Sequence, residues 1–140
     1  MKQIFSLAVI MMALMRLGMA QEIWQNHYRS EEVEINFRYV ACHDQANDIH
    51  KQLVVFRFVN LTDKDLTVSF DKRMWHGDKC TGCERSKENQ FTVKLAAHQT
   101  VAGSCDDKTK ALYIVEKMLE GTSQALTKFE LANIRVLTAQ

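Results

Sequence analysis

Alternation of apolar and polar side chains along short runs of residues is the feature that most constrains the fold of this chain. In residues 32–42, apolar side chains occupy every second position from Val33 to Tyr39, and polar side chains lie between them. This period of two is typical of a β-strand with one buried face. Residues 66–71 and 91–95 repeat the pattern. The chain is therefore predicted to be rich in β-strands.

Three further segments extend this prediction. Residues 53–59 are apolar on both faces apart from Arg57, which favours a strand in the centre of a sheet. Residues 60–65 are rich in turn-forming side chains and predict a hairpin that joins this strand to the one at 66–71. A short, weakly apolar strand is predicted at 100–105.

The C-terminal part of the chain is ambiguous between helix and strand. Residues 110–121 contain apolar side chains at helical spacing, but also the β-favouring run Tyr113-Ile114-Val115. We predict a strand that forms a long hairpin with a last strand at 127–137. The apolar phase changes partway along that last strand, which requires a β-bulge near Ala132 or Asn133.

Counted together, about seven short strands with regularly spaced turns predict an all-β fold, an antiparallel immunoglobulin-like β-sandwich stabilised by disulfides. The similarity to immunoglobulin domains is one of architecture, because the Cys-Trp-Cys spacing of true immunoglobulin domains is absent. Trp24 and Tyr28, which precede the first predicted strand, are expected to cap the core or to form an edge strand.

Residues 1–20 have the pattern of an export signal. Lys2 supplies a positive end, a short apolar stretch follows, and the small residues Gly18 and Ala20 stand where a signal peptidase reads. The apolar stretch is too short to remain as a membrane span. Cleavage after Ala20 would leave residues 21–140 as a single domain, in the periplasm or outside the cell.

The composition excludes several classes of function. The chain has 18 basic and 17 acidic residues, and loss of Lys2 and Arg16 with the signal would leave it nearly neutral, which gives no general attraction to nucleic acid. The sequence contains no proline and five glycines, which argues against a linker. It also lacks the local motifs of hydrolases, zinc proteases and nucleotide-binding enzymes, so a non-catalytic protein without a cofactor is predicted.

The four cysteines are predicted to form disulfides, because exported thiols normally oxidise. If successive strands reverse direction, Cys42, Cys80, Cys83 and Cys105 all lie at one end of the sandwich. Four cysteines allow three pairings. We favour the two in which Cys80 and Cys83 each bond to a cysteine at a strand end.

Two other functions of the same cysteines stay open. A zinc or copper site could use Cys80 and Cys83, at metal-ligand spacing, together with Cys42, Cys105 or His76. Thiol redox chemistry at Cys80 and Cys83 is the other alternative, and it would need a thiolate at a helix N-terminus.

A long loop at residues 72–90 is predicted to present a binding surface for a protein or a glycan, as in an envelope accessory protein. Long ordered loops on rigid scaffolds often carry binding sites, and this one mixes apolar and basic side chains as recognition surfaces do. The alternative for its tryptophan is packing over the disulfide end. The candidate binding residues are Lys72, Met74, Trp75, His76 and Lys79.

Overall fold

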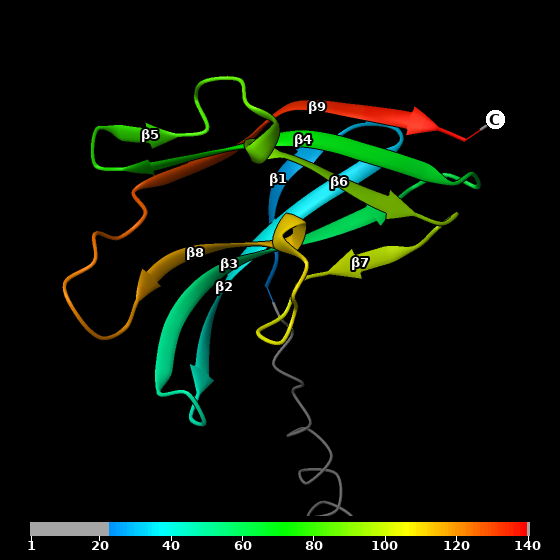
Figure 1. Cartoon of the computed structure of the whole chain (residues 1–140). Helices are drawn as coiled ribbons and strands as arrows, with labels where there is room; N and C mark the ends of the chain where they lie inside the picture. Colours follow the sequence, from blue (N-terminus) through cyan, green and yellow to red (C-terminus); the bar gives the residue numbers. More distant parts are fainter. Residues whose placement is uncertain (1–22, 140) are drawn as a thin grey trace, which may run out of the picture.

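The computed structural model describes residues 23–139 and shows an all-β protein with antiparallel sheets (Figure 1). The all-β prediction is confirmed. Nine strands occur in these residues: β1 (Gln25–Arg29), β2 (Val33–Asp44), β3 (Ile49–Asn60), β4 (Leu66–His76), β5 (Lys79–Thr81), β6 (Gln90–Leu95), β7 (Thr100–Ala102), β8 (Tyr113–Met118) and β9 (Lys128–Thr138). Short 3-10 turns, η2 (Lys87–Asn89) and η3 (Lys110–Leu112), precede β6 and β8.

The first sheet is built around β3. Strand β2 pairs with one edge of β3 along its whole length, and β1 pairs with the far edge of β2. The other edge of β3 is shared, because β7 pairs with its C-terminal half and β8 with its N-terminal half. The predicted central position of residues 53–59 is thus confirmed. Strand β1 is an edge strand, as one of the two predictions had it for Tyr28. Trp24 precedes β1 and packs against Leu53 and Val55 of the first sheet.

The second sheet is built around β4 in the same way. Strand β9 pairs with one edge of β4, and the other edge is shared by β6 and β5. Lys72 on β4 pairs with Leu131 on β9. The register between these two strands shifts between Ser69 and Asp71, which indicates a β-bulge. The bulge lies at Asn133, which has a positive φ of 51° and donates a hydrogen bond to Asp71 over 2.7 Å. The predicted bulge near Ala132 or Asn133 is confirmed.

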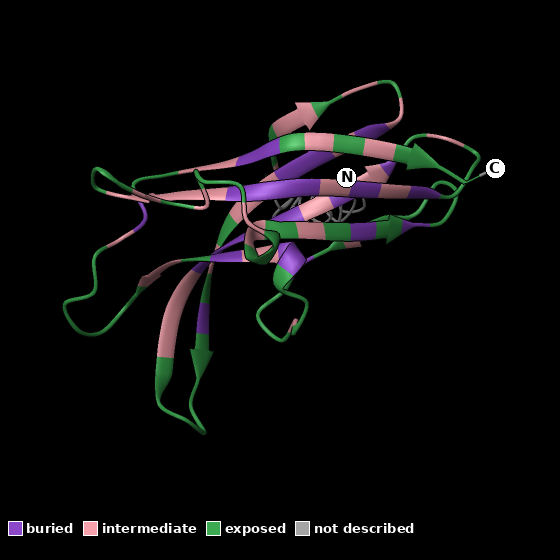
Figure 2. Ribbon diagram, turned by 45° about the horizontal axis from the view of Figure 1, so that its top comes forward, coloured by how far each residue is buried: buried purple, intermediate pink, exposed green. Residues whose placement is uncertain are grey.

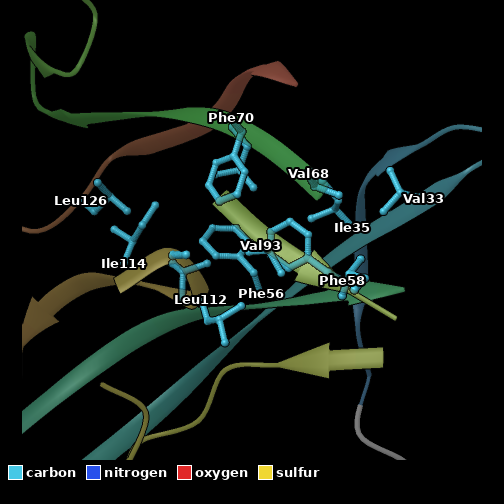
Figure 3. Close-up of a cluster of buried hydrophobic side chains, with 14 residues drawn as sticks. Val33, Ile35, Phe56, Phe58, Val68, Phe70, Val93, Leu112, Ile114 and Leu126 are labelled. Atoms are coloured by element: carbon cyan, nitrogen blue, oxygen red, sulfur yellow. The ribbon is translucent and has the colours of Figure 1, made fainter. Parts of the chain in front are cut away.

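The main core lies between the two sheets, and buried segments face each other across it (Figures 2 and 3). Large aromatic side chains fill it: Phe56 and Phe58 from β3 are fully buried, and Phe58 stacks on Phe70 from β4 with ring centroids 5.5 Å apart. A smaller cluster, Cys42, Leu53 and Val55, covers the outer face of the first sheet. Burial on both faces of β3 explains its continuous apolar sequence.

Both predicted hairpins are wrong. Strands β3 and β4 follow one another in sequence but belong to different sheets, and so do β8 and β9. The apolar alternation of these strands specifies one buried face, and either a paired neighbour or a facing sheet can bury it. The predicted strand at 110–121 is confirmed in its central part, as β8, and the predicted strand at 100–105 is confirmed over Thr100–Ala102.

The crossing from β3 to β4 is held by the side chain of Asn60, which is 2% exposed. Its amide donates to the carbonyls of Lys64 and Ala96 at 2.7 and 2.9 Å, and its oxygen accepts from the backbone N–H of Thr62 at 2.9 Å. Asn60-Leu61-Thr62 matches the N-glycosylation pattern. In the folded protein, however, this buried and fully bonded amide is not accessible to a glycan.

We expect Asn60→Ala to lower the free energy of unfolding by about 2 kcal/mol, because it leaves the partly buried N–H of Thr62 and two carbonyls without their partner. Urea unfolding monitored by circular dichroism measures this change. Asn47→Ala, which removes an exposed amide bonded to Asp44, is the control and should cost less than about 0.5 kcal/mol. Equal effects of the two substitutions would contradict the role of Asn60.

Candidate functional site

An open groove of about 500 Å³ lies between the C-terminal half of β4 and strand β8, and we call it the β4–β8 groove. Strands β4 and β8 belong to different sheets, so the groove forms where the inner face of the second sheet, at β4, lies opposite the edge strand β8 of the first sheet without pairing to it. Its volume falls within the range of small-molecule sites. The lining residues are Lys72, Met74, His76, Phe91, Lys110, Tyr113, Ile114, Val115, Glu116, Lys117, Met118, Ser123 and Gln124.

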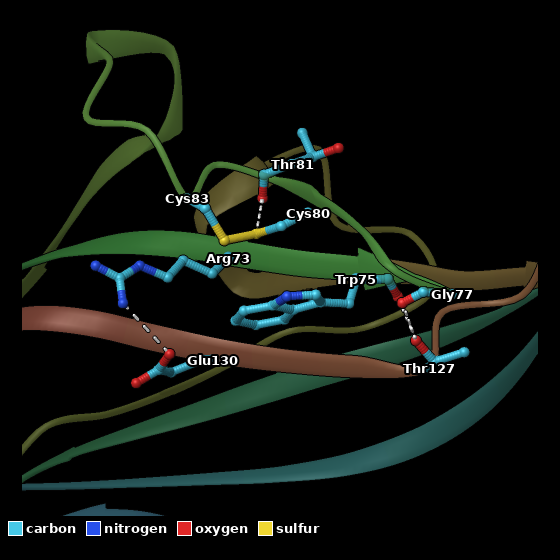
Figure 4. Close-up of a disulfide and its surroundings, with 8 residues drawn as sticks. All are labelled: Arg73, Trp75, Gly77, Cys80, Thr81, Cys83, Thr127 and Glu130. Atoms are coloured by element: carbon cyan, nitrogen blue, oxygen red, sulfur yellow. Dashed lines mark hydrogen bonds and ion pairs between the residues drawn. A yellow bond between two sulfur atoms is a disulfide. The ribbon is translucent and has the colours of Figure 1, made fainter.

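The pleat of β4 decides which of its side chains enter the groove. Side chains alternate between the two faces of a strand. Lys72, Met74 and His76 therefore continue the inner face on which Phe70 is buried. Arg73 and Trp75 lie on the outer face, where Figure 4 shows them beside the Cys80–Cys83 disulfide.

Lys72 is the unusual residue of the groove. Its side chain is 3% exposed, and Nζ donates hydrogen bonds to the carbonyls of Lys110 and of Tyr113, the latter over 2.7 Å. Nζ also lies 4.4 Å from the ring centroid of Phe91. Within residues 23–139 no carboxylate forms an ion pair with this amine. Burial away from water therefore lowers the pKa of Lys72 to about 7.

A second buried polar atom lines the same groove. Glu116 belongs to β8, at the point where its pairing with β3 is irregular. One carboxylate oxygen, Oε2, is buried and has no hydrogen-bond partner among the described residues. A buried acceptor without a hydrogen bond is costly, because it loses its water without replacement.

The charges around the groove are predominantly positive. Lys72, Lys110 and Lys117 contribute three amines, and Glu116 is the one carboxylate among the lining residues. His76 adds an imidazole. The rest of the wall is mainly apolar, from Met74, Phe91, Ile114, Val115 and Met118. An apolar cleft with a few placed charges is the usual form of a small-molecule site.

The structure divides the five predicted binding residues between two places. Lys72, Met74 and His76 line the β4–β8 groove. Trp75 lies outside it, with Nζ of Lys128 4.6 Å from its ring centroid, and Lys79 is exposed on β5. The predicted loop at 72–90 is wrong in its first part, because β4 continues to His76 and pairs there with β5.

The disulfide pairing differs from the two pairings that we favoured. Cys42 bonds to Cys105 and Cys80 bonds to Cys83, with Cα atoms 5.5 and 5.8 Å apart. Cys80 and Cys83 pair locally because β5 turns back on β4, with Gly82 at a φ of +85°. Cys80 is the cross-strand partner of Trp75, as expected if that tryptophan packs beside a disulfide.

The structure gives no support to the alternative functions of the cysteines. The two disulfides lie on different sheets and no described cysteine is free, so no thiolate remains to bind zinc or copper with His76. The Cys80-x-x-Cys83 motif forms part of the β5 hairpin rather than the start of a helix. The feature that would make Cys80 a reactive thiolate is therefore missing.

One group of metal-ligand side chains occurs in the described part of the chain, away from the cysteines. Possible ligand atoms of Asp48, His50 and Glu120 lie within 4.8 Å of one another. Nδ1 of His50 also lies 2.9 Å from Nδ1 of His43, its cross-strand partner. Asp48 and Glu120 are exposed, and exposed groups of this kind are common without an ion, so the β4–β8 groove remains the better candidate site.

Several groove residues were not recognised from the sequence. Phe91 and the β8 residues 113–118 were assigned to strands, but nothing in the chain indicated that they face β4. The position of Lys72 did carry a signal, because it continues the phase of Leu66, Val68 and Phe70. A lysine on the apolar face of a strand is unusual and points to a functional or structural role.

Among the described residues, no helix is long and apolar enough to span a membrane. The two disulfides indicate an oxidising, non-cytoplasmic compartment. The predicted export signal at residues 1–20 lies outside the described residues. Comparisons with protein-family models, curated proteins and solved structures find no match to this chain.

Proposed function

We propose that this protein is an exported, non-catalytic binding module and that the β4–β8 groove is its ligand site. The observation that carries the proposal is the groove itself: an open cleft with apolar walls and a buried lysine among its lining residues. Small-molecule sites commonly combine these features. For the architecture we retain an immunoglobulin-like sandwich, supported by two antiparallel sheets that share one core.

The proposed site differs from the one predicted from the sequence, because it is a groove between two sheets and not an exposed loop at residues 72–90. Three of the five candidate residues, Lys72, Met74 and His76, line the groove. Met74 contributes a flexible apolar side chain, which suits a site that adapts to its ligand. Binding of a protein or glycan partner at the outer residues Trp75 and Lys79 remains an untested prediction, and the groove gives no support to it.

The proposal is tested with N-phenyl-1-naphthylamine, an uncharged probe whose fluorescence rises in apolar surroundings. We expect saturable binding to the purified, oxidised protein. Met74→Trp should weaken this binding by about tenfold, which corresponds to about 1.4 kcal/mol, because the larger ring fills the groove. Leu137→Trp is the matched control, since Leu137 is 64% exposed and does not line the groove.

Two outcomes would overturn the groove as the ligand site. The first is absence of saturable probe binding to the wild-type protein. The second is equal binding by the Met74→Trp and wild-type proteins, with circular dichroism showing that the variant is folded. Binding that is lost in Leu137→Trp but not in Met74→Trp would place the apolar site elsewhere.

A further inference from the structure

From its chemistry, we infer that the β4–β8 groove takes a single-chain amphiphile with a carboxylate head group. The inference rests on the proposed function, because it names the ligand class of the same site. It is carried by two features that occur together: an apolar wall that suits a hydrocarbon chain, and a set of amines that suits an anion.

The apolar wall runs along both sides of the groove. Met74 and Phe91 line the side formed by the second sheet, and Ile114, Val115 and Met118 line the side formed by β8. Met74 and Phe91 are only partly buried, so a ligand chain placed between the two sides would cover apolar surface that now faces water. Burial of apolar surface is favourable and needs no directed hydrogen bonds. An alkyl chain therefore suits this wall better than a polar sugar does.

The amines favour an anionic head group over a neutral or cationic one. Three lysines and one carboxylate line the groove, so the potential inside it is positive. Of the three amines, that of Lys72 is buried. Charge-assisted hydrogen bonds from lysine to carboxylate are stronger than those between neutral groups.

Lys72 also has no carboxylate counter-ion among the described residues. Its amine has three hydrogens, and the carbonyls of Lys110 and Tyr113 accept two of them. A ligand carboxylate beside Lys72 would accept the third and would supply a negative charge that no residue from 23 to 139 supplies. An interaction of this kind in a water-poor site is worth more than the same pair at the surface.

Burial of Lys72 makes the affinity for a carboxylate depend on pH in a defined direction. Without ligand, the pKa of Lys72 is about 7, and a bound carboxylate raises it by favouring the charged form. Affinity for a carboxylate should therefore fall as the pH rises above about 7. The other titratable groups of the groove are His76, Lys110, Tyr113, Glu116 and Lys117.

The experiment is calorimetric titration of the oxidised protein with decanoate, decanol and decylammonium at about pH 6, where the carboxylate of decanoate is ionised. These probes share one chain and differ in the charge of the head group. We expect decanoate to bind about tenfold more tightly than decanol, and decylammonium to bind least tightly.

Variants identify the residues responsible. Lys72→Met should reduce the preference for decanoate over decanol by about tenfold. Glu116→Gln should increase the preference for decanoate over decanol, because it removes the opposing charge. Lys94→Met, in an exposed position on β6 outside the groove, is the matched control. His76→Gln should retain the fall in decanoate affinity above about pH 7, which separates Lys72 from the imidazole.

The outcomes separate this inference from the proposed function. Equal affinities for the three probes would overturn the carboxylate preference while leaving an apolar ligand site. Preference for decanoate that is unchanged in both Lys72→Met and Glu116→Gln would also overturn it, because the groove charges would then play no part. Failure of all three probes and of N-phenyl-1-naphthylamine to bind would overturn the proposed function itself.

Discussion

Replacement of both Cys42 and Cys105 by alanine is expected to lower the free energy of unfolding by about 4 kcal/mol. The bond joins residues 63 positions apart in the sequence, and closing a loop of that length removes much of the conformational freedom of the unfolded chain. Cys42 is 5% exposed and packs with Leu53 and Val55. Loss of the bond therefore also loosens the small cluster on the outer face of the first sheet.

The matched control is the double alanine variant of Cys80 and Cys83. These cysteines are separated by only 3 positions, so the same loop-entropy argument gives about 2 kcal/mol. Guanidinium unfolding of both double variants, compared with the wild-type protein, measures the difference. A smaller loss of stability for the Cys42 and Cys105 variant than for the control would contradict this account of the long-range disulfide.

The second large effect is a pH dependence of stability that is caused by Lys72. Burial lowers its pKa from 10.5 to about 7, so between these values the unfolded chain binds more protons than the folded protein. The free energy of unfolding must therefore rise with pH across this window. Below about pH 7 the amine is charged in both states, and the contribution no longer changes.

Lys72→Met removes this dependence. From about pH 7 to about pH 10, the wild-type protein should gain about 3 kcal/mol of stability relative to the variant. The difference between wild type and variant isolates Lys72, because every other titratable group is present in both proteins. Urea unfolding across this range measures the gain. Lys94→Met should follow the wild-type curve, and a Lys72→Met curve parallel to it would show that Lys72 keeps an ordinary pKa.

Strand positions were largely predictable from the sequence, because apolar and polar side chains alternate along a strand that has one buried face. The alternation in residues 32–42 corresponds to β2, and the change of apolar phase near Asn133 corresponds to the bulge in β9. This alternation does not show which strands pair with one another. Strands β3 and β4 were therefore predicted as a hairpin, although Asn60 holds a crossing between sheets.

The candidate site was predictable only in part. Lys72, Met74 and His76 were selected for their chemistry, but as members of a surface loop. The strand was predicted to end at Asp71, because the run Asp71-Lys72-Arg73 is polar. The alternation that places Lys72 on the same face as Phe70 was therefore not recognised. The opposite wall, strand β8, comes from a segment about forty residues further along the chain. No local pattern indicates that such a segment will face β4.

The disulfide pairing could not be obtained from strand direction. Reversing strands brought Cys105 to the same end as Cys42, and the structure bonds them. The short hairpin at β5 was not recognised, because its strand has 3 residues. Without that hairpin, nothing indicated that Cys80 and Cys83 would bond to each other.

The central claim is that the β4–β8 groove is the ligand site, and mapping of backbone amide chemical shifts during titration with decanoate tests it most directly. We predict that the shifts concentrate at the amides of Met74, His76 and residues 113–118, which line the groove. Shifts concentrated instead around Trp75 and Lys79, or along the β2–β3 hairpin, would contradict the claim, as would a titration that changes no amide.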